Sequence, residues 1–158
     1  GVLRLEAAKL AGHGPALPRS PRSAYDPTLG LAFFPRALDK TRLHAAGELP
    51  AEYHANLGQG ADARLCRFLR IEYDKLRERV LAGGADEEIL EWCFETGRRL
   101  SEEDRQIYTK FSEKLGWRDE DNGATQRLEK FKSEAGLGHR DDILTIFDFF
   151  EVDEGRRK

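Results

Sequence analysis

The chain lacks the features on which small secreted and membrane-spanning proteins depend. Its 158 residues include only two cysteines, Cys66 and Cys93, with no CxxC pair, so we expect free, reduced thiols in a cytoplasmic protein. No apolar run approaches the roughly 18 residues of a membrane span, and no secretory segment is present, so we expect no membrane association. Methionine is absent, even at the first position, so the sequence does not identify the natural N-terminus.

Motifs that carry well-known chemistries are also missing. The sequence has no GxSxG, no GxGxxG and no Walker loop, which are the usual signs of serine hydrolases and nucleotide-binding domains. Its four histidines (His13, His44, His54 and His139) are scattered and form no HExxH or HxH. We expect neither a metal nor a cofactor. The net charge of -3 argues against nucleic-acid binding.

Helical patterns dominate what is present. Charged residues make up 35% of the chain and hydrophobic residues 39%, and apolar residues recur at helical spacing between glycines and prolines. The pattern predicts an all-α fold, a single compact domain of about seven helical segments. The first firm helix should start at Pro35 and stop at Gly47. Later helices should be capped by Asp62, Asp86, the capping box that starts at Ser101, and Asp141.

The N-terminal residues form a distinct arm in this interpretation. Residues 1–12 have the apolar spacing of a short helix, whereas four prolines in residues 13–28 favour an extended segment. We therefore assign residues 1–28 to an N-terminal arm and residues 29–158 to the helical domain.

The densest group of charged residues follows Pro35 and gives the first candidate site. Arg36 and Lys40 are four residues apart and share one face near the positive end of the predicted helix, with Asp39 and Arg42 beside them. Such a helix start can hold a carboxylate or a phosphate. The alternative is equally simple: Asp39 lies three residues from both arginines, so these charges could satisfy one another.

A second candidate site lies in the predicted loop at residues 48–60. Tyr53, His54 and Asn56 can supply directed hydrogen bonds, and an unperturbed histidine titrates near neutral pH. In the alternative interpretation Tyr53 anchors the loop in the core and His54 lies in water.

From Pro18 onward the chain resembles a bacterial family known as a domain of unknown function, number five thousand and sixty-nine. The resemblance rests on Ser20-Pro21-Arg22, on the PRALDKTR run at residues 35–42, and on Glu52-Tyr53-His54 with Asn56. It continues through Asp86, Trp92, Asp142-Ile143, Phe147-Asp148 and the VDEGR run at residues 152–156. The chain departs from the family pattern at Ala55, at residues 57–61 and at Ile146. The resemblance implies no activity.

Three functions fit these observations. The first is a non-enzymatic binding or adaptor module that holds a small anion or a protein segment near the helix starting at Pro35. The second is a small enzyme in which His54 is a general base, Asp39 or Asp148 orients it, and Arg36 stabilises negative charge. The third is a structural unit that forms a homodimer through Phe149 or Phe150 of its apolar C-terminal helix.

Overall fold

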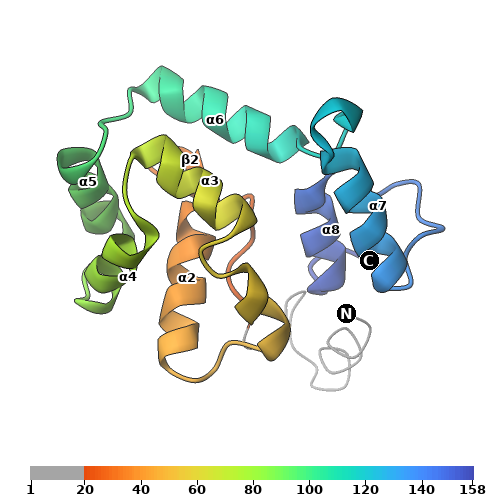
Figure 1. Ribbon diagram of the computed structural model, residues 1–158, viewed down its shortest axis with the longest axis horizontal. Coiled ribbons are helices and arrows are strands. Elements are labelled where there is room, and N and C mark those ends of the chain that lie inside the picture. Colours follow the sequence, from red (N-terminus) through yellow and green to blue (C-terminus); the bar gives the residue numbers. More distant parts are fainter. Residues whose placement is uncertain (1–19) are drawn as a thin grey trace. The chain divides into compact units, whose positions relative to one another are not determined.

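The computed structural model of the protein describes residues 20–158 (Figure 1). The helix expected within residues 1–12 and most of the predicted arm lie outside the described residues. In residues 20–158 the secondary structure comprises seven α-helices, two short 3₁₀ helices and one two-stranded sheet, which confirms the all-α class. The chain divides into two compact units: one comprises Pro21–Thr109, and the other contains Lys110–Lys158.

A small β-hairpin opens the first unit. Strands β1 (Pro27–Thr28) and β2 (Leu31–Ala32) pair in the antiparallel direction. The turn residues Leu29 and Gly30 have φ angles of 49° and 80°, and two successive left-handed residues are what a tight hairpin turn requires. The sequence analysis missed this hairpin because a proline at the start of a strand also suits an extended arm.

The side chain of Thr109 binds the backbone of this hairpin. Its Oγ1 accepts a hydrogen bond of 3.0 Å from the N–H of Ala32. The same hydroxyl donates a bond of 2.9 Å to the carbonyl oxygen of Gly30. Residues nearly eighty positions apart in the sequence are therefore held together by one hydroxyl.

Helix α2 (Phe34–Ala45) packs against β1 and α4. It begins after Phe33, whose φ of 73° is left-handed, and Pro35 occupies the first turn. It ends shortly before Gly47, whose φ is 72°. The start and stop predicted from Pro35 and Gly47 are thus confirmed. Leu38 on this helix is fully buried.

A 3₁₀ helix and three α-helices complete most of the first unit: η1 (Ala51–Asn56), α3 (Gly60–Leu69), α4 (Tyr73–Leu81) and α5 (Asp86–Thr96). The expected helices are present, but the expected caps are wrong. Gln59 and Ala85 occupy the N-cap positions, and neither helix has a side-chain cap. The carboxylates of Asp62 and Asp86 instead bind basic side chains from other elements.

Helices α3 and α5 come very close where each of them ends. Gly97 is the C-cap residue of α5, and a Cβ placed on it would lie 2.2 Å from the carbonyl oxygen of Leu69 and 2.8 Å from that of Arg70. Such distances are far below normal contact, so the packing requires glycine at this position.

The capping box predicted at the start of α6 (Glu102–Lys114) is confirmed. The Asp104 N–H donates to Ser101 Oγ at 3.0 Å, and the Ser101 N–H donates to Asp104 Oδ2 at 2.9 Å. Apolar residues recur at four-residue spacing along this segment, at Ile107, Phe111 and Leu115. Ile107 and Phe111 are exposed, whereas Leu115, just after the helix, is buried. The spacing therefore marks the helix, but only the last of the three residues lies in the core.

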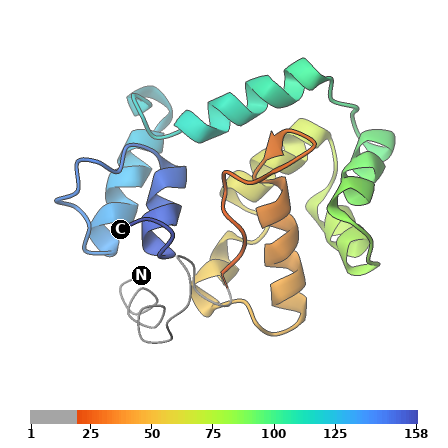
Figure 2. The ribbon, with the colours of Figure 1, turned by 180° about the vertical axis from the view of Figure 1, so that it is seen from behind.

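The second unit contains η2 (Glu120–Asn122), α7 (Ala124–Glu134) and α8 (Ile146–Asp153). Helices α7 and α8 lie side by side, as Figure 2 also shows, and enclose a core that includes Leu128 and Phe149. The cap predicted at Asp141 is wrong, because Thr145 Oγ1 accepts the N–H of Asp148 and caps α8. Within residues 20–158 no helix is long and apolar enough to cross a membrane.

Candidate functional site

Lys40 of α2 points into the protein and binds Asp62 of α3. Its Nζ lies 3.0 Å from each carboxylate oxygen, and the two residues are 6% and 2% exposed. Asp62 Oδ2 also accepts the N–H of Gly58 at 3.1 Å. The ammonium group that the sequence suggested for an external anion is therefore neutralised by a carboxylate of the protein itself.

Arg36 is buried as well, with 2% of its surface exposed. Its Nη1 donates to the carbonyl oxygen of Arg22 at 3.1 Å, and its guanidinium carbon lies 6.0 Å from the centre of the Tyr53 ring. The structure thus brings Arg36 and Tyr53 together. Both side chains form part of the interior of the first unit.

Asp39 and Arg42 belong to a closed group of four charged side chains with Arg22 and Asp86. Arg22 binds Asp39 at 2.9 Å and Asp86 at 2.7 Å. Arg42 binds Asp86 at 2.9 Å and lies 3.7 Å from Asp39. The pKa of Arg22 is raised, chiefly by its hydrogen bond with Asp39. The group has no net charge, and it joins the segment before β1 to the middle of α2 and to the start of α5.

His54 of η1 contacts a backbone carbonyl and another histidine. His54 Nε2 is 2.9 Å from the carbonyl oxygen of Leu49, and its ring packs edge-on against His44 at 5.0 Å. Among residues 20–158 no carboxylate is hydrogen-bonded to His54. Asn56 is exposed, and its carbonyl oxygen accepts the N–H of Gln59 at 3.0 Å. The hydrogen bond from a carboxylate to His54 that the enzyme hypothesis expects is thus not seen among these residues.

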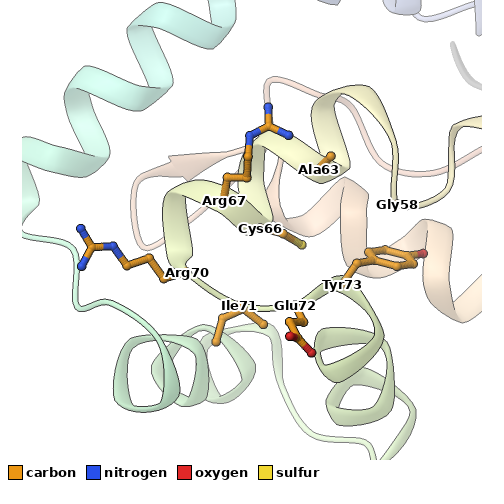
Figure 3. Close-up of a pocket in the computed structure, with 8 residues that line it drawn as sticks. All are labelled: Gly58, Ala63, Cys66, Arg67, Arg70, Ile71, Glu72 and Tyr73. Carbon is orange, nitrogen blue, oxygen red and sulfur yellow. The ribbon is translucent and has the colours of Figure 1, made fainter.

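An open pocket of about 360 Å³ lies between α3 and α4 (Figure 3). Its lining residues are Gly58, Ala63, Cys66, Arg67, Arg70, Ile71, Glu72 and Tyr73. Figure 3 shows the sulfur of Cys66 and the ring of Tyr73 facing the pocket, whereas the guanidinium groups of Arg67 and Arg70 extend outward from its rim. The pocket therefore has apolar walls and a basic border.

The electrostatics of the pocket favour an anion. Arg67 and Arg70 are exposed, and neither forms an ion pair within residues 20–158. Glu72 is the only carboxylate among the lining residues. Burial raises the pKa of Cys66 to about 11, and burial also raises the pKa of Tyr73, so both groups are neutral at pH 7. The lining residues thus carry two positive charges, at the rim, and one negative charge, and the walls are neutral.

Gly58 connects the buried ion pair to this pocket. Its N–H donates to Asp62, the partner of Lys40. A Cβ on Gly58 would lie 2.8 Å from Cδ1 of the Tyr73 ring, and the φ of Gly58 is +71°. The loop before α3 therefore packs directly on one wall of the pocket, and the Lys40–Asp62 pair fixes the loop.

Comparison with known families supports the resemblance seen in the sequence. The model of the family described as "Domain of unknown function (DUF5069)" matches residues 17–156. The chain belongs to this family. No curated protein matches it. The DUF5069 match covers α2 to α8, so it includes the buried ion pair, the four-charge group and the pocket.

The two arginines that border the pocket were not predicted from the sequence. Arg67 and Arg70 are three apart near the end of α3, a spacing that also suits an ordinary solvent-exposed helix face. The left-handed end of that helix is visible only in the structure: Arg70 has a φ of 58°, which is uncommon for a residue other than glycine. No group of three His, Cys, Asp or Glu residues within residues 20–158 is arranged to hold a metal.

Proposed function

We propose that this DUF5069 chain is a non-enzymatic binding module for a small anionic molecule with an apolar body. The ligand would occupy the pocket between α3 and α4. The observation that carries this proposal is the pairing of apolar pocket walls with two rim arginines that have no acidic partner among residues 20–158. A guanidinium group can bind a carboxylate or a phosphate through two parallel hydrogen bonds.

The size and chemistry of the pocket support binding over catalysis. Its volume of about 360 Å³ is near the lower end of the range of roughly 300–1,000 Å³ found for small-molecule sites. The raised pKa values of Cys66 and Tyr73 leave both groups protonated near neutral pH. A protonated thiol is a poor nucleophile, and a neutral phenol is a poor base.

The charged residues of α2 support the walls of the pocket. Lys40 holds Asp62, and Asp62 holds Gly58 against the wall formed by Tyr73. Arg36, Asp39 and Arg42 fix α2 to its neighbours. A pocket whose walls are already in place loses less entropy when it binds a ligand.

Titration with simple anions tests this function. We would add benzoate, phenyl phosphate, inorganic phosphate and neutral benzamide, and follow backbone amide NMR signals and the melting temperature. The two aromatic anions should shift signals from α3 and α4 and raise the melting temperature, because a ligand that binds the folded state stabilises it. Inorganic phosphate and benzamide should bind more weakly, since each lacks one of the two required features.

Three variants localise the effect. Arg67→Ala combined with Arg70→Ala should weaken binding of the aromatic anions by roughly tenfold or more. Glu72→Gln should strengthen it, because a negative charge is removed, and Ala63→Phe should block the pocket. Arg127→Ala removes an exposed arginine from α7 and serves as the matched control. Equal binding by the wild type and the double variant would reject this site.

A further inference from the structure

Two aromatic side chains are half-exposed beside each other in the second unit. Phe111 lies near the end of α6, and Trp117 follows in the next turn, with 48% and 50% of their surfaces exposed. They border a recess of about 260 Å³ that is also lined by Lys110, Lys114 and Asp119. Large exposed aromatics gathered at a recess are typical of protein–protein contact sites.

The turn that carries Trp117 is firmly held. The N–H of Gly116 donates to Asp119 Oδ2, and the N–H of Asp119 donates to Thr125 Oγ1, each at 2.8 Å. The Thr125 hydroxyl in turn donates to the carbonyl oxygen of Gly116 at 2.8 Å. These three bonds close a ring around the turn. The backbone that carries the indole is therefore held in place before any partner arrives, which reduces the entropy lost on binding.

The backbone at this turn also adopts an uncommon conformation. Arg118 has a φ of 58°, in the left-handed region that residues other than glycine seldom occupy. Its guanidinium carbon lies 5.5 Å from the centre of the Trp117 ring, within the range of a cation–π contact. The turn thus places a positive charge against the exposed indole.

The charges around the recess are mainly positive. Lys110 pairs with Glu113 at 3.3 Å, whereas Lys114 and Arg118 have no carboxylate partner within residues 20–158. The carboxylate of Asp119 is already bound by the Gly116 N–H and by the side chain of Asn122. The surface formed by Lys110, Phe111, Lys114, Trp117 and Arg118, here called the Trp117 surface, is basic on a chain whose net charge is -3.

We propose that the Trp117 surface docks an acidic segment of a partner protein, with one apolar side chain of that segment in the recess between Phe111 and Trp117. The aromatic rings supply the apolar contact, and the cations select acidic flanks. The Trp117 surface shares no residue with the pocket between α3 and α4. It gives the chain a protein partner in addition to its small ligand.

The observations favour a partner protein over nucleic acid. Nucleic-acid affinity comes mainly from many phosphate contacts, and an acidic chain with three cations at this surface offers few.

The test uses a short fluorescein-labelled synthetic peptide in which Asp and Glu flank a single Phe. Fluorescence anisotropy with the full chain should show saturable binding that weakens as salt is added. A peptide with Lys in place of the acidic residues, and one with Ala in place of Phe, should bind at least tenfold more weakly. Absence of saturable binding by the acidic peptide would overturn the proposal.

Variants assign the contact to this surface. Trp117→Ala should weaken binding at least tenfold, whereas Trp117→Phe should retain most of it. Lys114→Glu should reverse the preference and favour the basic peptide. Lys130→Glu makes the same charge change on exposed α7 and should leave affinity unchanged. Melting curves confirm that each variant is folded.

Two results would reject the assignment of the partner. The first is unchanged peptide affinity in folded Lys114→Glu. The second is a concentration-dependent dimer that Trp117→Ala abolishes, which would show that a second copy of the chain binds this surface.

Discussion

The ammonium group of Lys40 donates to both carboxylate oxygens of Asp62, at 3.0 Å each, in the interior of the first unit. Removing one member of such a pair leaves the other charge buried without compensation. We expect Asp62→Asn to lower the free energy of unfolding by about 3–5 kcal/mol, measured by urea denaturation.

The exposed pair of Lys75 and Glu78, whose nitrogen and oxygen are 3.6 Å apart, provides the control for this measurement. Glu78→Gln should cost less than about 1 kcal/mol. The buried pair would not have the structural role described here if both changes had the same small effect. Lys40→Met combined with Asp62→Leu should be milder than Asp62→Asn, because no unpaired charge remains.

Gly97 is the second test of packing, at the meeting point of α3 and α5. Gly97→Ala would place a methyl group 2.2 Å from the carbonyl oxygen of Leu69, so the helix ends must move apart. We expect the free energy of unfolding to fall by about 1–3 kcal/mol. Gly138→Ala is the matched control, because its nearest neighbouring atom would be 3.8 Å away. Thermal unfolding of both variants measures this difference in stability. Equal melting temperatures would contradict the requirement for glycine at position 97.

The two buried thiols predict how stability changes at alkaline pH. Burial raises the pKa of Cys66 to about 11 and that of Cys93 to about 12, from an ordinary value of 9.0. The folded state therefore keeps both protons at pH values where the unfolded chain releases them. Stability from this source is complete below pH 9 and is lost as the pH rises from about 9 towards 12.

Unfolding experiments across this pH range measure the effect. The free energy of unfolding should fall more steeply above pH 9 in the wild type than in Cys66→Ala combined with Cys93→Ala. Alkylation by iodoacetamide at pH 8 should also be about a hundredfold slower than for an exposed cysteine, because the thiolate fraction is lower. Rapid alkylation of the folded chain would contradict the raised pKa values.

The helices were predictable because their ends are marked locally. Pro35 at the first turn of α2, Gly47 after it, and the reciprocal bonds of Ser101 and Asp104 all depend on residues within a few positions of one another. The class of the fold follows from such marks. The β-hairpin escaped prediction because Thr109, which binds its backbone, is remote in the sequence.

The caps and the site depended on contacts that local sequence does not reveal. Asp62 and Asp86 have the residue type of helix caps, but Lys40 and two arginines bind them across the fold. The spacing of Arg36 and Lys40 correctly predicted that both residues lie on the same face of the helix. It did not indicate that this face points inward, because the direction is set by α3 and its buried carboxylate. The pocket likewise needs two helices and the loop at Gly58 together.

The hydroxyl of Thr109 has a consequence for association between molecules. Short sheets with open edges can recruit strands from neighbouring chains, which leads to domain swapping and aggregation. Thr109 occupies the N–H of Ala32 and the carbonyl of Gly30, two groups that an incoming strand would need. A single side chain on a helix therefore hinders the addition of a foreign strand at these two groups.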